Sequence, residues 1–280
     1  MNRLLIVDGH NLLFQMFYGM PSRIVGKDGR PVQGVLGFVG ALLKIIEIVS
    51  PSHVVVLFDG EHENFRSALN PDYKSNRTDY SDVEEIDNPF SQLKYIYQAL
   101  DVLKILYYEE DKYEVDDIIA SYVYKYGNEI EIVISSFDSD YFQLINDKVT
   151  VLRYRGKNTV ICNRSYIFER FGIVPDFYAD FKSLTGDSAD NIKGIEAVGN
   201  KTAMKLINEF GGIEEIILHS AEIAGERVRN SIINNEQRIK NNFQLIKLND
   251  IGKIPFALNE LAYTYNGLKT NSVLERIGLI

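Results

Sequence analysis

The chain has 280 residues, of which 45% are hydrophobic, so it can bury a substantial core as one large domain or two smaller ones. Its single cysteine, Cys162, excludes an intramolecular disulfide and a cysteine-rich zinc site. The formal net charge is −9, which taken alone argues against nucleic acid as a partner. There is no apolar run of membrane-spanning length and no pattern typical of a signal peptide, so we expect a cytoplasmic protein.

The first half of the chain alternates short apolar runs with helical patterns, which is typical of a mostly parallel sheet covered by helices. We predict strands at residues 4–7, 54–58, 102–106 and 132–135, and helices at 35–49, 90–100, 116–126 and 140–145. A closing hairpin is predicted at 149–154 and 159–161. The polar stretch 64–88 has no clear place in the sheet, and long excursions of this kind are often functional.

From about Pro175 the strand patterns fade, and helical segments with glycine-rich joints dominate. They are predicted at 176–184, 201–210, 213–219 and 227–248. We therefore predict an α/β domain over residues 1–174, followed by a helical C-terminal domain over residues 175–280.

Acidic residues gather where the predicted strands end. Asp8 follows the first strand, Asp59 the second, and Asp138 and Asp140 the strand that ends at Ser135. Ligands bind at the carboxyl ends of parallel strands, so these side chains are expected to share one crevice. Five more carboxylates stand at a helix start and in a later loop: Glu114, Asp116, Asp117, Asp187 and Asp190.

Each of these carboxylates could be an ordinary helix cap or turn residue when taken singly. Converging carboxylates repel one another, however, and divalent cations relieve that repulsion. Ligand sets made only of oxygen select hard cations such as Mg²⁺ or Mn²⁺. Two such ions can activate water for phosphodiester hydrolysis, so the carboxylates predict either a hydrolase of this kind or a non-catalytic cation site.

Several stretches stand in an order that resembles the bacterial flap endonucleases, the 5′→3′ exonuclease domain that also forms the N-terminal part of DNA polymerase I. They are Ile6–Gly9, Phe58–Asp59, Phe65–Arg66, Tyr73–Arg77, Glu114–Ile119, Asp138–Asp140, Gly186–Ile192 and Gly199–Ala203. The resemblance implies a PIN-like domain with a helical arch at about 64–95. It also implies a helix-three-turn-helix element, of the helix-hairpin-helix type, at about 182–212 for duplex DNA.

The resemblance further implies two or more Mg²⁺ (or Mn²⁺) ions in one pocket. The carboxylates that match the first site are Asp8, Asp59, Glu114 and Asp116. Those that match the second site are Asp138, Asp140, Asp187 and Asp190. Asp117 lies between the two sets, and the residues expected to act in catalysis are Lys74, Arg77, Asp117 and Asp140.

Basic residues are expected to hold the DNA. Lys74 and Arg77 are three residues apart, so on a helix they would share one face and could grip the scissile phosphate. Arg66 either contacts phosphate or pairs with a carboxylate, and Tyr73 is the candidate for contact with an unpaired nucleotide. A glycine-containing turn before a helix can offer N–H groups to a phosphate, and the residues expected there are Lys193, Gly194, Gly199, Lys201, Thr202 and Lys205. By resemblance, this turn also holds K⁺.

The sequence departs from the family pattern in several places. Gln15 occupies a position where relatives usually carry Arg. Phe137 replaces the usual Gly before Asp138, and Ala197 replaces the first Gly of the hairpin. Residues 78–87 of the arch contain five acidic residues and no basic one, so flap threading is expected to be weaker or more salt-sensitive.

The leading hypothesis is a 5′-flap endonuclease and 5′→3′ exodeoxyribonuclease that acts in DNA replication and repair. One alternative is a PIN-like ribonuclease, and another is a branched-DNA binding module with little catalysis. We expect a monomer, with any DNA polymerase acting in trans.

Overall fold

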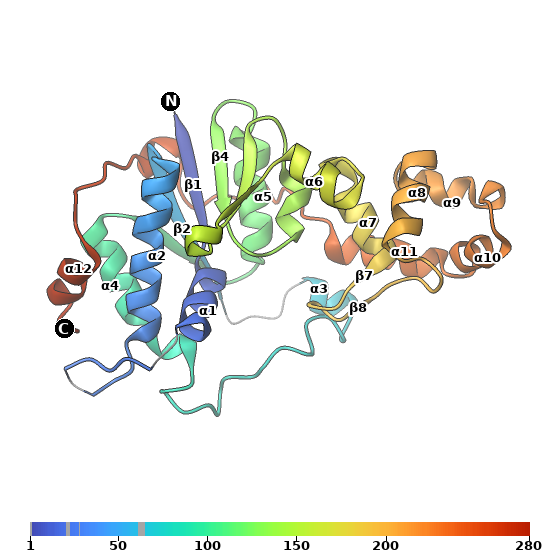
Figure 1. Ribbon diagram of the computed structural model, residues 1–280. Coiled ribbons are helices and arrows are strands. Elements are labelled where there is room, and N and C mark those ends of the chain that lie inside the picture. Colours follow the sequence, from blue (N-terminus) through green and yellow to red (C-terminus); the bar gives the residue numbers. More distant parts are fainter. Residues whose placement is uncertain (1, 21–22, 28, 61–64) are drawn as a thin grey trace.

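The computed structural model describes residues 2–20, 23–27, 29–60 and 65–280; residue 64, the expected start of the arch, lies outside the described residues. Its centre is a six-stranded sheet with the strand order β3-β2-β1-β4-β5-β6 (Figure 1). The strands are β1 (Arg3–Asp8), β2 (His53–Asp59), β3 (Leu106–Glu110), β4 (Glu131–Ser135), β5 (Val149–Arg153) and β6 (Val160–Cys162). All pairings are parallel except that of β5 with β6, which confirms the predicted α/β fold with a mainly parallel sheet.

Helices cover both faces of the sheet because the central strands are apolar on both sides. In β1, Leu5 and Val7 belong to one core cluster, and Leu4 and Ile6 belong to the other. The first cluster is covered by α1 (Gly9–Gly19), α2 (Gln33–Val49), α4 (Leu93–Leu103) and α12 (Thr270–Arg276). The second is covered by α5 (Val115–Tyr126) and by helices that follow β6.

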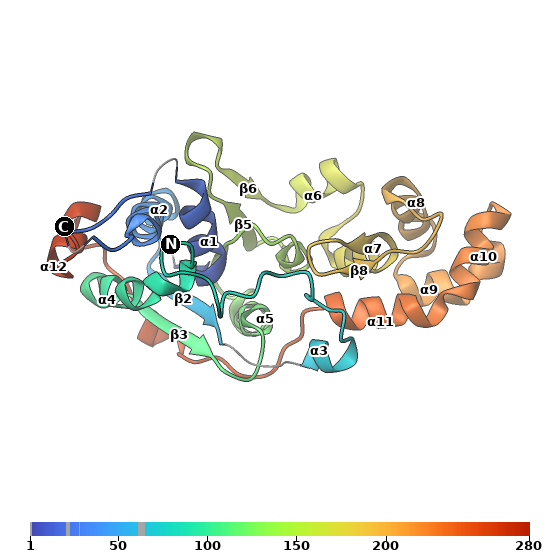
Figure 2. The ribbon, with the colours of Figure 1, turned by 90° about the horizontal axis from the view of Figure 1, so that it is seen from below.

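The C-terminal helices form a second lobe beside the sheet (Figures 1 and 2). They are α6 (Arg164–Phe171), α7 (Tyr178–Thr185), α8 (Asn200–Phe210), α9 (Ile213–Leu218), α10 (Glu226–Asn234) and α11 (Glu236–Ile246). A two-stranded ribbon, β7 (Gly186–Asp187) and β8 (Ile192–Lys193), joins α7 to α8. Every residue of α7 except Thr185 is buried. After α11 the chain returns to the sheet, where α12 packs against α2 and α4.

Short 3₁₀ helices link these elements: η1 (Pro89–Gln92), η2 (Asp140–Leu144), η3 (Gly156–Asn158), η4 (Pro175–Phe177), η5 (Ser220–Glu222) and η6 (Leu258–Leu261). Among the residues that the structure describes, none of the helices has the length and apolar character needed to cross a membrane.

Three predicted elements differ from the structure. The strand predicted at 102–106 is wrong, because α4 continues to Leu103, and β3 begins only at Leu106 after a left-handed cap at Lys104. The single helix predicted at 227–248 breaks at Asn235 into α10 and α11. The helix predicted at 140–145 is the 3₁₀ helix η2.

The segment expected to form a helical arch is mostly non-helical. Within the described residues 65–92, the helices are α3 (Phe65–Leu69) and η1, separated by turns and extended chain. Lys74 has a φ of 55°, which an α-helix cannot contain. Lys74 and Arg77 therefore do not lie on one helix face as predicted. The crowded acidic residues at 79–87 repel one another and bring few apolar side chains to bury, which disfavours a helix there.

Candidate active site

A pocket of about 640 Å³ opens at the carboxyl ends of β1 and β2 and at the start of α5. Five of the predicted metal ligands line it: Asp8, Asp59, Glu114, Asp116 and Asp138. The structure thus brings together side chains from three strand ends and one helix start, as the parallel sheet requires.

Hydrogen bonds from neighbouring elements fix the strand-end carboxylates. The Asn11 backbone N–H donates to Asp8 Oδ1 at 3.1 Å, and the Ser136 hydroxyl donates to Asp8 Oδ2 at 2.9 Å. The backbone N–H of Val115 donates to Asp59 Oδ1 at 2.8 Å. These donors hold the two carboxylates in place without supplying a positive charge.

The electrostatics of the pocket favour a cation. Burial, followed by repulsion from Asp116, raises the pKa of Asp59 to about 6. The same two causes raise the pKa of Asp138 to about 6. Burial, with Asp116 and Asp59 adding to it, also raises the pKa of Asp8 well above its usual range. A bound cation would relieve this repulsion.

A second carboxylate cluster lies beside the first. Oxygen atoms of Asp140, Asp187 and Asp190 lie within 4.8 Å of one another. Burial is the largest of the causes that raise the pKa of Asp140 to about 8. Asp138 lines the first pocket, and the negative charge of Asp190 in the second cluster also raises its pKa, so it lies between the two clusters. Oxygen donors at this spacing fit a hard divalent cation.

Sequence reasoning missed Lys182, which is buried between these carboxylates. Its ammonium donates to Asp140 Oδ1 at 2.5 Å and also contacts Asp187. Although burial by itself lowers the pKa of Lys182, Asp140 and Asp187 raise it above its usual range. One pattern could have revealed it: a lysine at an apolar position of a helix that is followed by an acidic loop.

Arg66, Tyr73 and Asp117 form one buried hydrogen-bonded group around Glu114. Arg66 is 3% exposed, and its guanidinium donates to both oxygens of Asp117 at 2.7 and 2.9 Å and to Glu114 at 2.9 Å. Arg66 therefore pairs with carboxylates, which is one of the two roles expected for it. Tyr73 is buried and donates to Glu114, whereas the predicted contact with an unpaired nucleotide needs an accessible ring. Asp117 also accepts from the Asn249 N–H, so both of its oxygen atoms have hydrogen-bond donors, and its role as a metal ligand stays a prediction.

Lys74 and Arg77 both line the pocket, although a turn rather than a helix places them there. The Lys74 ammonium donates to Glu114 Oε1 at 2.8 Å. Arg77 donates to Asp190 Oδ1 at 3.0 Å, and its side chain is 57% exposed. The Lys74 backbone N–H bonds the Asp190 carbonyl, which ties this turn to the β7–β8 loop.

The predicted DNA-contacting turn lies in the C-terminal lobe, directly after the β7–β8 ribbon that carries Asp187 and Asp190 (Figure 1). It connects β8 to α8, and Gly199 caps α8. A Cβ atom at Gly194 would come within 2.3 Å of the Thr185 carbonyl oxygen, so only glycine fits that close approach. The remaining members of the predicted set in this region are Lys193, Lys201, Thr202 and Lys205, of which the last three line a hollow of about 320 Å³.

Some residues at the site were not predicted, and others were noted only because they differ from the family pattern. The Tyr141 hydroxyl bonds Asp116, and Asn11 accepts from the Phe137 N–H. Gln15 donates to the Tyr154 carbonyl at 2.5 Å, so it links α1 to the end of β5. A strand-end hydroxyl or amide next to an aspartate is too common a pattern to single these residues out.

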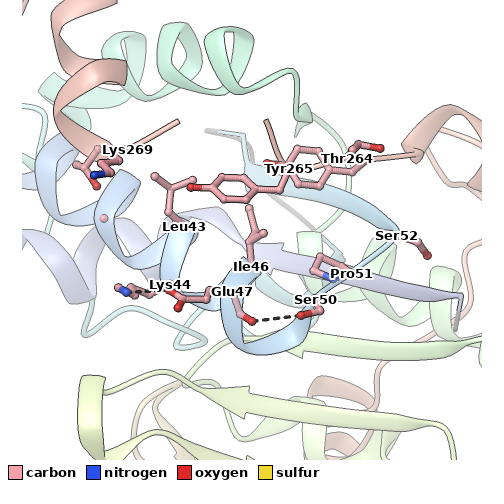
Figure 3. Close-up of a pocket in the computed structure, with 13 residues that line it drawn as sticks. Leu43, Lys44, Ile46, Glu47, Ser50, Pro51, Ser52, Thr264, Tyr265 and Lys269 are labelled. Atoms are coloured by element: carbon pink, nitrogen blue, oxygen red, sulfur yellow. Dashed lines mark hydrogen bonds and ion pairs between the residues drawn. The ribbon is translucent and has the colours of Figure 1, made fainter. Parts of the chain in front are cut away.

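A further hollow, of about 690 Å³, lies between α2 and the segment around residues 263–270 (Figure 3). Its charged lining pair, Lys44 and Glu47, is joined at 2.8 Å, and Ser50 donates to the Glu47 carbonyl. None of the predicted site residues is among the described residues that line it.

Two family models match almost the whole chain. The 5′-3′ exonuclease N-terminal resolvase-like domain matches residues 3–172, and the 5′-3′ exonuclease C-terminal SAM fold matches residues 173–267. A 5′-3′ exonuclease of Bacillus subtilis is 34% identical over 221 residues, which cover 77% of this chain and 73% of the relative. Thermostable DNA polymerase I of Thermus thermophilus is 33% identical over 82% of this chain, but the chain spans only 27% of that polymerase.

Solved structures share the fold. A complex of the bacteriophage T5 D15 flap endonuclease with DNA and metal ions matches with a TM-score of 0.73 and 22% identity, covering 99% of both chains. T5 5′-exonuclease with bound zinc matches with a TM-score of 0.70 and 24% identity, covering 88% of this chain and 90% of the other. The matches confirm the resemblance and the fold class inferred from the sequence. The chain belongs to the 5′-3′ exonuclease family.

Proposed function

We propose that this chain is a divalent-metal-dependent 5′-nuclease that hydrolyses phosphodiester bonds at 5′ flaps, branches and 5′ ends of DNA. The observation that carries the proposal is a pocket lined by five carboxylates and two cationic side chains, with a second carboxylate cluster beside it. The family supports it, as does the fold shared with a flap endonuclease described with DNA and metal ions.

The carboxylates would hold the metal in two groups. Asp8, Asp59 and Asp116 would serve the first, and Asp140, Asp187 and Asp190 the second. Asp138 stands where it could serve either, and Glu114 would join the first group only by giving up its hydrogen bond from Lys74. When bound, Mg²⁺ or Mn²⁺ supplies positive charge and an activated water to the hydrolysis.

Lys74 and Arg77 would position the phosphodiester. Both already bind carboxylates at the pocket, so they can exchange those partners for phosphate oxygens with little loss of hydrogen bonding. Positive charge aimed at the phosphate also stabilises the charge that develops in the transition state. Arg77 is the more exposed of the two and would meet the substrate first.

The turn before α8 would bind the duplex part of the substrate, at a distance from the phosphodiester bond that is cleaved. Gly199 leaves the first N–H groups of α8 without a side-chain cap, and such groups suit a phosphate. Lys193, Lys201 and Lys205 would add positive charge that attracts the same DNA strand. We propose K⁺ at this turn as well, on the strength of the resemblance alone.

The test compares substrates and metals. Labelled 5′-flap DNA, matched flap RNA and Mg²⁺ are incubated with the wild-type protein, with EDTA, and with Asp140→Asn. We expect the wild-type protein to cut the DNA flap. EDTA should abolish this activity, and Asp140→Asn should lack it. Cutting of RNA alone would favour a PIN-like ribonuclease, and binding without cutting would favour a branched-DNA binding module.

A role in replication and repair fits the polymerase and exonuclease relatives. A polymerase acting in trans, a monomeric state and a cytoplasmic location stay predictions.

A further inference from the structure

We propose that the ammonium of Lys182 occupies the position of the second divalent cation, so that a metal can bind there only by displacing it. This inference rests on the proposed function, because it concerns how the second carboxylate cluster is filled. It makes Lys182 a positioning residue that controls metal binding at the site.

The geometry around Lys182 is that of a bound cation. Its ammonium lies 2.5 Å from Asp140 Oδ1 and contacts Asp187 Oδ2. The side chains of Lys182, Asp140 and Asp187 are 8%, 10% and 12% exposed, so water screens these contacts poorly. The ammonium therefore contacts two of the three carboxylates in the cluster and offsets one of their negative charges.

A metal ion and this ammonium cannot share the cluster. A divalent cation would bind the same oxygen atoms of Asp140 and Asp187 at about 2.1 Å. Two cations on the same oxygen atoms would repel each other strongly in a buried place. Asp190 offers the third carboxylate of the cluster and is held by Arg77, so the metal would gain it only at the cost of that ion pair.

The displaced ammonium has a nearby place to go. The Ser139 hydroxyl lies 3.4 Å from the Lys182 ammonium, on the side of η2. A lysine side chain is long and flexible enough to turn toward this acceptor while its helix stays fixed. We therefore expect the second cation to bind more weakly than the first, because it must first break two ion pairs.

Free Mn²⁺, counted by electron paramagnetic resonance during titration, tests the inference. The wild-type protein is expected to show a tighter and a weaker site. Lys182→Met removes the charge and keeps most of the volume, so the weaker site should tighten at least about tenfold. Lys44→Met, which changes an exposed lysine on α2, should leave both affinities as they are.

The outcomes separate this inference from the proposed function. Two Mn²⁺ sites with unchanged affinities in folded Lys182→Met would overturn the inference and leave the proposed nuclease intact. Absence of Mn²⁺ binding in the wild-type protein, or binding that Asp140→Asn does not weaken, would overturn the carboxylate metal site itself and the inference with it.

A second measurement uses the wild-type protein and does not depend on the variant folding. Lysines are acetylated with an N-hydroxysuccinimide ester and located by mass spectrometry, with and without Mn²⁺. Lys182 should resist labelling without metal and gain label when Mn²⁺ is added, whereas Lys44 should not change. Equal labelling of Lys182 in both conditions would contradict displacement.

Discussion

At the scale of single residues, the site is a set of buried carboxylates that the protein only partly neutralises. Arg66 and Lys182 supply the buried positive charge, and each has two or more polar partners; the partly exposed Lys74 is paired with Glu114. Removing one partner of a buried ion pair costs more than the pair itself contributes, because it leaves the other charge unpaired. The basic residues nearest the carboxylates therefore support the fold as well as any chemistry.

Arg66 gives the sharpest prediction of this kind. Arg66→Ala should lower the free energy of unfolding by about 3–5 kcal/mol, because Asp117 and Glu114 lose a buried partner. Denaturant unfolding measures the change. Arg23→Ala is the matched control, since its ion pair with Asp87 is exposed and should contribute less than about 1 kcal/mol. Equal effects of the two variants would contradict the assignment.

The raised pKa values of Asp59 and Asp138, both about 6, predict how metal binding depends on pH. In the folded, metal-free protein these groups hold protons above their ordinary pKa of 3.8. Their contribution to stability is thus fully present below that value and is lost as the pH rises through about 6. Protons also compete with metal, so Mg²⁺ should raise Tm more at about pH 7.5 than at about pH 5.5. A larger Mg²⁺ effect at the lower pH would contradict this account.

At the scale of elements, the sequence predicted the sheet and its carboxylate edge well but not the segment that crosses it. Strand ends are marked by apolar runs followed by Asp8 and Asp59, a pattern that depends only on local sequence. The start of β3 was misplaced because Leu103 continues the apolar face of α4. Lys182 was missed because its partners lie in other elements, which no local pattern reveals, and the two roles expected for Arg66 could not be separated for the same reason.

The turn before α8 offers a test at this scale. Ala197 has a φ of 63°, a region in which glycine is favoured. Ala197→Gly should therefore stabilise the protein by roughly 0.5–1 kcal/mol. Ala203→Gly, inside α8, should instead destabilise it by about 1 kcal/mol, and thermal unfolding compares the two. Destabilisation by both changes would argue against strain at Ala197.

At the scale of the whole molecule, the net charge of −9 can be compared with the number of carboxylates predicted for the site. The nine carboxylates predicted for the metal pocket equal the excess of acidic over basic residues, so the rest of the chain is formally neutral. DNA binding must then depend on where the basic residues lie rather than on an overall positive charge. The acidic segment 78–87 should add little to it.

DNA affinity should accordingly fall only moderately as the salt concentration rises, because few phosphates are contacted. Lys201→Ala, next to the cap of α8, should reduce the slope of log affinity against log salt concentration by about 1. Lys240→Ala, on α11 and paired with Glu236, serves as the control and should leave the slope unchanged. Fluorescence anisotropy with duplex DNA in Ca²⁺ measures both slopes. An unchanged slope for Lys201→Ala would place the duplex elsewhere.

The central claim is that the converging carboxylates hold the metal that hydrolyses DNA. The most direct measurement is the single-turnover rate of 5′-flap cleavage in Mg²⁺ by the wild-type protein and by Asp8→Asn, with folding checked by circular dichroism. Asp8 lies at the end of β1 and lines the pocket, so the account predicts a loss of at least about 100-fold. A folded Asp8→Asn that cuts the flap at the wild-type rate would contradict it.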